Sequence, residues 1–188
     1  MTVETLDCKL EYLKEHFPKT FAHSERVGDV SKKIGLELAL PYDKVELLYV
    51  AGLFHDIGKV YLGPELVENA STLSNSEKAV FRNHTLLGSV FVNRHTSEYG
   101  EHECKVLSDV ARAHHDFQKK SFCRNKSYYL NGTKPYVEII SFADMLDALS
   151  QERSYQEKLP IDEALEVARE NFLGDERIPY AAERIFLK

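Results

Sequence analysis

The sequence lacks two features that would each define a class of protein. Its three cysteines, Cys8, Cys104 and Cys123, are odd in number, far apart and form no Cys-x-x-Cys pair. This excludes a disulfide-stapled fold and favours reduced thiols. The longest apolar run, residues 47–54, is too short to span a bilayer, and the N-terminus has no apolar signal segment. We therefore expect a cytoplasmic protein with no attachment to a membrane.

Positive charge is also in deficit, because 24 lysines and arginines face 30 aspartates and glutamates, which gives a net charge of -6. A protein that coats DNA or RNA needs a basic face, so we expect no stable nucleic-acid partner. A local basic pocket for a small anion remains compatible with this charge. The length of 188 residues suits one domain over residues 1–188, with a motif-bearing core over 20–155 and C-terminal helices over 160–188. The sequence leaves oligomerisation open.

Strand-like alternation is missing too, and helical periodicity replaces it almost throughout, which predicts an all-α fold. Ser74 and Glu77 have the spacing of a capping box that begins a helix. Residues 57–73 are expected to be irregular, and the polar residues 116–134 to form a long loop. The expected helices cover residues 3–15, 20–40, 42–55, a segment around His84, 101–115, 135–150, a stripe of Leu165, Ala168 and Phe172, and 179–187.

Histidine, by contrast, is abundant, with eight in the chain. His55 follows Leu48 by seven residues and Ala51 by four, which places it on the apolar face of its helix. The other ionisable residues with apolar neighbours at helical spacing are His23, His84, His114 and Asp144. Any one such histidine, taken alone, is more often a hydrogen-bonded core residue than a ligand.

Five helices that each direct an ionisable group to the core form a more specific pattern. Buried polar groups are costly unless they are paired, and a shared metal centre would satisfy all of them together. The neighbouring pairs His55-Asp56 and His114-His115 lie about 100° apart on a helix. Such neighbours can address one metal together or two metals side by side. The sequence therefore predicts a metal centre inside a helical bundle.

The ordered motifs resemble the HD superfamily, and most closely its HD-GYP branch. The resemblance covers residues 21–155 and rests on five motifs. They are His23, HDIGK at 55–59, HTLLG at 84–88, HHD at 114–116 and ADMLDALSQERSY at 143–155. It implies an HD-domain helical bundle with a metal centre in its core. The implied metal ligands are His23, His55, Asp56, His84, His114, His115 and Asp144.

The resemblance also implies roles for single residues. Asp56 would bridge two metals, Lys59 would contact a substrate phosphate, and Arg153 matches a second phosphate-contacting position. Lys19 stands where relatives with three metals have glutamate, so two divalent transition metals are expected. Iron or manganese is favoured by the resemblance, while cobalt, nickel and zinc also suit imidazole and carboxylate ligands. The Gly-Tyr-Pro motif is absent, which puts cyclic di-GMP in question as the substrate.

Two metals suit hydrolysis of a phosphate ester by a metal-activated hydroxide. Asp56 and Lys59 are the expected catalytic residues, and the substrate-binding set is Lys59, Arg153, Lys119 and Lys120. Lys119 and Lys120, with Arg124 and Lys126, would form a basic rim that attracts a multiply charged substrate. An ordinary solvated loop is an equal alternative.

Three functions fit these residues. The first is a phosphodiesterase that hydrolyses a nucleotide, including a cyclic dinucleotide, and it is favoured by the double histidine. The second is an HD phosphohydrolase of nucleoside monophosphates or other small phosphomonoesters. The third is a degenerate domain that binds a nucleotide or serves as a scaffold without turnover. The complete ligand set opposes this third function, because each ligand would be an unpaired buried group without metal.

Overall fold

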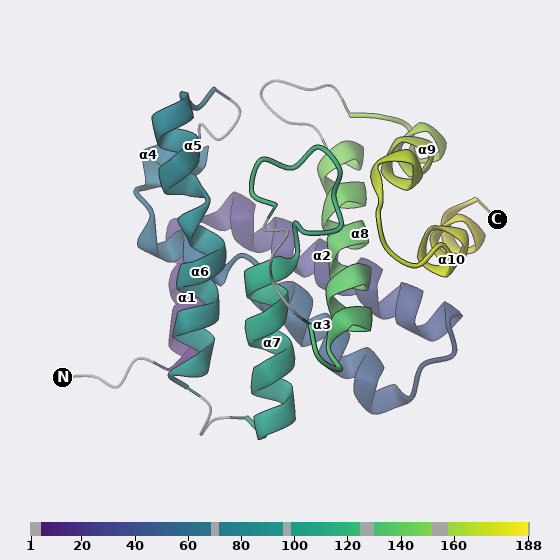
Figure 1. Ribbon diagram of the computed structural model, residues 1–188, viewed down its shortest axis with the longest axis horizontal. Helices are drawn as coiled ribbons and strands as arrows, with labels where there is room; N and C mark the ends of the chain where they lie inside the picture. The colour runs from purple at the N-terminus through teal and green to yellow at the C-terminus, as the bar shows by residue number, and fades with distance from the viewer. Residues whose placement is uncertain (1–4, 69–71, 96–98, 125–129, 152–157, 188) are drawn as a thin grey trace.

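The chain folds as a helical bundle, and a computed structural model describes residues 5–68, 72–95, 99–124, 130–151 and 158–187 (Figure 1). Within these ranges no β-strand forms, which confirms the all-α prediction. No helix in the described ranges is long and apolar enough to cross a membrane. The elements are α1 (Leu6–His16), α2 (Pro18–Glu37), α3 (Tyr42–Phe54), the 3-10 helix η1 (Ile57–Tyr61), α4 (Pro64–Glu68), α5 (Asn75–Phe81), α6 (Asn83–Asn93), α7 (Glu101–Ala113), α8 (Lys134–Ser150), α9 (Ile161–Asn171) and α10 (Arg177–Phe186).

Local sequence signals begin several of these helices. Pro18 occupies the start of α2, where its missing N–H costs nothing. The predicted capping box is confirmed, because Ser74 Oγ accepts from Glu77 N at 3.3 Å and Glu77 Oε2 accepts from Ser74 N at 2.7 Å. It begins α5, which leads into α6 and the first turn that carries His84.

The prediction of an irregular segment over residues 57–73 was wrong in part, because η1 and α4 lie within it. Gly58 explains how η1 packs. A Cβ atom built there would lie 1.9 Å from His84 O and 2.5 Å from Gly88 N. A side chain at this position would collide with the backbone of α6, so glycine permits η1 to lie directly on that helix. This contact places the segment after His55 beside His84.

The main core lies where α2, α3, α7 and α8 meet. Val27, Leu48, Leu107 and Ile140, one from each of these helices, are fully buried and belong to one cluster. Figure 1 shows α6, α7 and α8 in a row, with α9 and α10 on the outer side of α8. Burial of apolar side chains on this scale can stabilise the bundle without disulfide bonds. Ionisable side chains from several of these helices can thus reach the interior of the bundle.

The chain after α7 was predicted to form a long loop, and its described part, residues 114–124 and 130–133, contains no helix. A second, smaller core lies beneath it and consists of the buried side chains of Leu62, Leu73, Phe81 and Cys123. Burial raises the pKa of the Cys123 thiol to about 12, so this side chain behaves as an apolar group. The loop is therefore fastened to α5 close to the histidines.

Candidate metal centre

All seven predicted ligands lie in one cluster, and Asp56 is at its middle. Asp56 Oδ1 lies 3.5 Å from His84 Nε2 and 3.7 Å from His114 Nε2. Asp56 Oδ2 lies 3.3 Å from His55 Nε2 and 4.0 Å from His23 Nε2. The carboxylate is thus shared between two groups of imidazoles, one facing each oxygen.

Asp144 on α8 closes the opposite side of the cluster. Asp144 Oδ1 lies 3.1 Å from His23 Nε2 and 4.0 Å from His55 Nε2, and Asp144 Oδ2 lies 3.7 Å from His115 Nδ1. His23, His55 and Asp144 each offer one ligand atom within 4.8 Å of the others. These three residues form one potential cation position.

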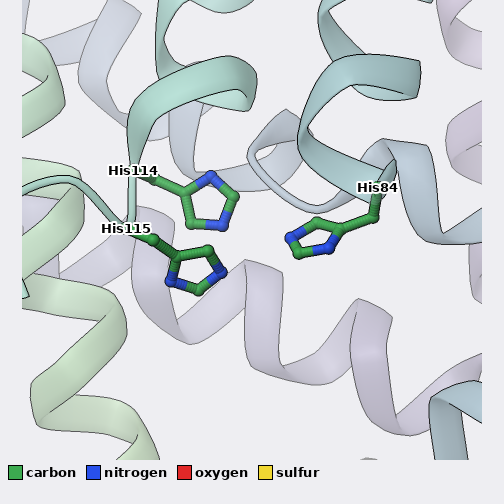
Figure 2. Close-up of side chains that lie close together, drawn as sticks. All are labelled: His84, His114 and His115. Carbon is green, nitrogen blue, oxygen red and sulfur yellow. The ribbon is translucent and has the colours of Figure 1, made fainter. Parts of the chain in front are cut away.

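A second potential position is formed by His84, His114 and His115, which also offer ligand atoms within 4.8 Å of one another. Figure 2 shows the three rings turned toward a common space, with a nitrogen of each ring pointing into it. His114 and His115 are neighbours at the end of α7, whereas His84 comes from the first turn of α6. Both members of the double histidine therefore face the same space.

In three of the imidazoles, Nδ1 points away from the centre of the cluster and is held by a hydrogen bond to a backbone carbonyl. His55 Nδ1 donates to Gly52 O at 2.7 Å, His84 Nδ1 donates to Phe81 O at 2.7 Å, and His114 Nδ1 donates to Val110 O at 3.1 Å. A proton on Nδ1 leaves the lone pair of Nε2 free. Hydrogen bonds of this kind orient histidines that bind metals.

Four buried atoms in the cluster have no hydrogen-bond partner: the Nε2 atoms of His55, His84 and His114, and Oδ1 of Asp56. Buried polar atoms without partners are costly. All four are lone-pair donors that face one another, so they fit divalent metal and do not fit a set of mutual hydrogen bonds. Imidazole and carboxylate together suit transition metals.

Electrostatics keep these donors in the protonation states that metals require. Burial lowers the pKa of His84 to about 3 and lowers those of His114 and His115 as well, so these rings are neutral near pH 7. Burial would raise the carboxyl pKa of Asp56, but the positive charge of Lys59 and the nearby imidazoles outweigh it and hold that pKa well below its usual range. Asp56 is therefore a carboxylate.

His23 differs from the other imidazoles because carboxylates contact both of its nitrogens. Burial would lower its pKa, but the hydrogen bonds to Asp144 and Asp147 more than offset this, and the pKa is raised. His23 Nδ1 lies 2.7 Å from Asp147 Oδ2, and Arg26 donates to both oxygens of Asp147, at 2.6 and 3.0 Å. Asp147 thus connects a predicted ligand to an arginine on the same helix, α2.

Sequence reasoning gave no role to Asp147, Arg26 or Gln118. A signal for the first two existed, since Asp147 follows Asp144 by three residues and Arg26 follows His23 by three, which puts each pair on one helix face. Gln118 lies in a loop and carried no such signal. Its side chain is buried and hydrogen-bonded to Asp144 and His115.

The predicted substrate-binding residues lie in different environments. Lys59 Nζ is 2.5 Å from Asp56 Oδ2, and its side chain is 16% exposed at the edge of the cluster. Lys119 Nζ instead donates to Glu170 O at the end of α9, and Lys120 is exposed. Arg153 and Lys126 lie outside the described residues. Lys59 alone among the described members of this set contacts a predicted ligand.

The pattern that defines the HD domain matches residues 20–149, which is most of the chain. The chain belongs to the HD domain family. HD domains bind divalent metals, and this one supplies a cluster of histidines and aspartates suited to them. The sequence prediction of an HD-superfamily member is thereby confirmed.

Relatives of this HD domain include two proteins of Vibrio cholerae. One, the 3'3'-cGAMP-specific phosphodiesterase 1, is 27% identical over 90% of this chain and 37% of its own length. Another, the 3'3'-cGAMP-specific phosphodiesterase 3, is 31% identical over 82% of this chain and 32% of its own length. The chain therefore spans about a third of the length of these relatives.

Among solved structures, an HDG"Y"P protein from Bdellovibrio bacteriovorus has a similar fold, with a TM-score of 0.65 at 17% identity. The match covers 89% of this chain and 52% of that chain. The helical fold predicted from the HD resemblance is shared with this neighbour. At this identity the structural likeness concerns the fold alone.

Proposed function

We propose that this HD domain is a metal-dependent phosphodiesterase whose substrate is a cyclic dinucleotide. The observation that carries the proposal is the set of four buried lone-pair donors without partners, on His55, His84, His114 and Asp56. The names of the Vibrio cholerae relatives support the substrate class. A domain kept only as a scaffold would have no need for these costly atoms.

We further propose two metal positions, with Asp56 between them. His84, His114 and His115 would hold one ion, while His23, His55 and Asp144 would hold the other. Asp56 is suited to bridge because its two oxygens face the two groups separately. The donor set is rich in imidazole and includes carboxylates, so it suits transition metals, and the resemblance to the HD-GYP branch favours iron or manganese among them.

Divalent metals bound there would supply Lewis-acid stabilisation of a phosphoryl group and water of lowered pKa. The protein's own contribution begins with orientation, since the Nδ1 hydrogen bonds hold the imidazoles without rotation. Lys59 adds a cation at the edge of the cluster, 2.5 Å from Asp56 Oδ2. We assign it to an oxygen of the substrate phosphate, where negative charge increases as the ester is cleaved.

Elemental analysis and a hydrolysis assay test this function together. Protein purified without added metal should contain about two transition-metal ions per chain, as expected for a two-metal site. With Mn²⁺ it should hydrolyse 3'3'-cGAMP or cyclic di-GMP and bis(p-nitrophenyl) phosphate. Turnover of only p-nitrophenyl phosphate would indicate a monoesterase. Protein that binds no metal and hydrolyses none of these would contradict the proposal and favour a binding module.

A further inference from the structure

The side chain of Gln118 contacts residues of both proposed metal positions. It follows α7 in the chain and is 8% exposed. Its Nε2 donates to Asp144 Oδ2 at 2.7 Å and to Ser141 O at 3.2 Å. Its Oε1 lies 3.0 Å from His115 Nδ1. One amide therefore contacts a predicted ligand from each of the two proposed metal positions.

These contacts determine which way the amide faces. A carboxylate and a backbone carbonyl are acceptors only, so the group facing them must be the NH2 of the amide. The carbonyl oxygen of Gln118 then faces His115 and can only accept. His115 Nδ1 must consequently carry the proton in this contact. Its Nε2 is left with a lone pair on the side of the ring that faces His84 and His114 (Figure 2).

We propose that Gln118 is a positioning residue, which fixes the tautomer of His115 and the rotation of the Asp144 carboxylate. This proposal rests on the proposed function, since it concerns the same metal positions. With Asp144 Oδ2 engaged by the amide, Oδ1 is directed toward His23 and His55. Both effects are of the kind by which groups beyond the ligands raise metal affinity.

The chain around Gln118 is held by a segment beyond the region that matches the HD family, which ends at residue 149. Lys119 N donates to Asn171 O at 2.9 Å, and Leu173 N donates to Phe117 O at 2.9 Å. This pairing includes the isolated bridge between Gln118 and Phe172. The Phe172 ring packs 5.2 Å from the Phe142 ring of α8. The end of α9 thus fixes the backbone from which Gln118 reaches the metal ligands.

Gln118→Met provides the central test, because methionine has a similar length and no amide. Chelator-treated protein would be titrated with Mn²⁺, and bound metal would be counted after removal of free ions. We expect wild-type protein to bind two ions and Gln118→Met to bind at least one of them about 10–100-fold more weakly. Gln118→Ala truncates the same contacts without adding bulk, and the same weakening is expected if methionine does not fit.

The matched control is Asn171→Met, which removes a buried amide from the segment paired with Gln118. Asn171 Nδ2 donates to Val167 O at 2.8 Å, so its loss should lower thermal stability. The backbone carbonyl of Asn171 still accepts from Lys119 N in this variant, so Mn²⁺ affinity should stay within about twofold of wild type. Nitrogen-15 spectra of metal-free protein add a second readout: His115 should carry its proton on Nδ1 in wild type and in Asn171→Met. That preference should weaken in Gln118→Met.

The outcomes separate the two proposals. If wild-type protein binds two ions and the Gln118 variants bind them equally well, the role of Gln118 is overturned and the proposed function stands. A wild-type protein without bound Mn²⁺ overturns both. Equal weakening in Asn171→Met and Gln118→Met would show that loss of a buried amide, not the contacts to His115 and Asp144, causes the effect, and this also overturns the role of Gln118.

Discussion

The histidines of the cluster fall into two groups, which differ in the hydrogen-bond partner of Nδ1. His55, His84 and His114 donate from Nδ1 to a backbone carbonyl three or four residues earlier in the chain. His23 and His115 contact side chains instead, Asp147 and Gln118. The first group takes its orientation from the local backbone, so it needs only a helical turn in the right place. The second group depends on side chains that tertiary packing must deliver.

This difference has a consequence for how the two groups respond to mutation. Backbone carbonyls cannot be deleted, so the first group is disturbed only by removal of a histidine or by movement of a helix. The second group can lose its orientation through a single side-chain change elsewhere in the fold. Side chains that orient ligands typically affect metal affinity by about 10–100-fold.

The largest effect should follow removal of a backbone-oriented histidine. We expect His55→Ala to lose bound metal. Its phosphodiesterase turnover should fall by at least about 100-fold, which is more than the fall caused by loss of a side chain that only orients a ligand. Elemental analysis and the bis(p-nitrophenyl) phosphate assay measure both. His95→Ala is the matched control, because His95 Nδ1 also donates to a backbone carbonyl, Phe91 O at 2.7 Å, but the ring is outside the cluster. Full metal content in His55→Ala would rule out the assigned site.

Asp147→Asn should weaken metal binding through His23 alone. Asparagine keeps the shape of the side chain but removes the charge that holds both His23 and Arg26. We expect Mn²⁺ affinity to fall by about 10–100-fold at one position, as measured by titration of chelator-treated protein. Asp175→Asn serves as the control. Asp175 also pairs with an arginine, because Arg177 Nη2 lies 2.6 Å from Asp175 Oδ2, but this pair is outside the cluster. If both variants lose affinity equally, the special role of Asp147 is refuted.

The two groups also differ in how well the sequence reveals them. The buried cluster could be anticipated in part, because five of its members are ionisable residues at helical spacing from apolar neighbours. The resemblance to the HD superfamily added the other two, Asp56 and His115. The contacts of the orienting residues were harder to predict. Helical spacing puts Asp147 on one face with Asp144, but it does not show that Asp147 meets His23, which is 124 positions away in the sequence. Periodicity shows which face a residue occupies, but not which side chain it meets there.

The fold was predictable to a similar degree. Helical periodicity and the capping box at Ser74 gave the class and most of the helices. The helices in residues 57–73 were missed because they are only five residues long, which is too short for periodicity to appear. Gly58 lies in the segment that was predicted to be irregular, whereas it allows η1 to approach α6. Glycine required by a close contact resembles glycine in a loop until the partner is known.

Gly58→Ala tests whether His84 depends on the position of its helix. The added Cβ would meet backbone atoms of α6, and backbone cannot rotate away, so η1 and α6 must separate. We expect the free energy of unfolding to fall by about 1–3 kcal/mol and Mn²⁺ binding to weaken as His84 moves. Gly63→Ala is the control, because no atom lies within 4 Å of a Cβ built there. Equal stability of the two variants in urea denaturation would contradict the close approach of η1 to α6.

The smallest effect should come from a change at the start of α5. The last residue of this helix, Phe81, supplies the backbone carbonyl that orients His84. Ser74→Ala removes the acceptor of the capping hydrogen bond that Glu77 N donates, and it should lower the free energy of unfolding by about 1 kcal/mol. Mn²⁺ affinity should change by less than about twofold, because Phe81 O remains available to His84 Nδ1 as a backbone acceptor. Thermal denaturation and metal titration of the same samples measure the two quantities. If loss of this cap weakened metal binding tenfold, His84 would depend on distant side chains as His23 does, and the division into two groups would fail.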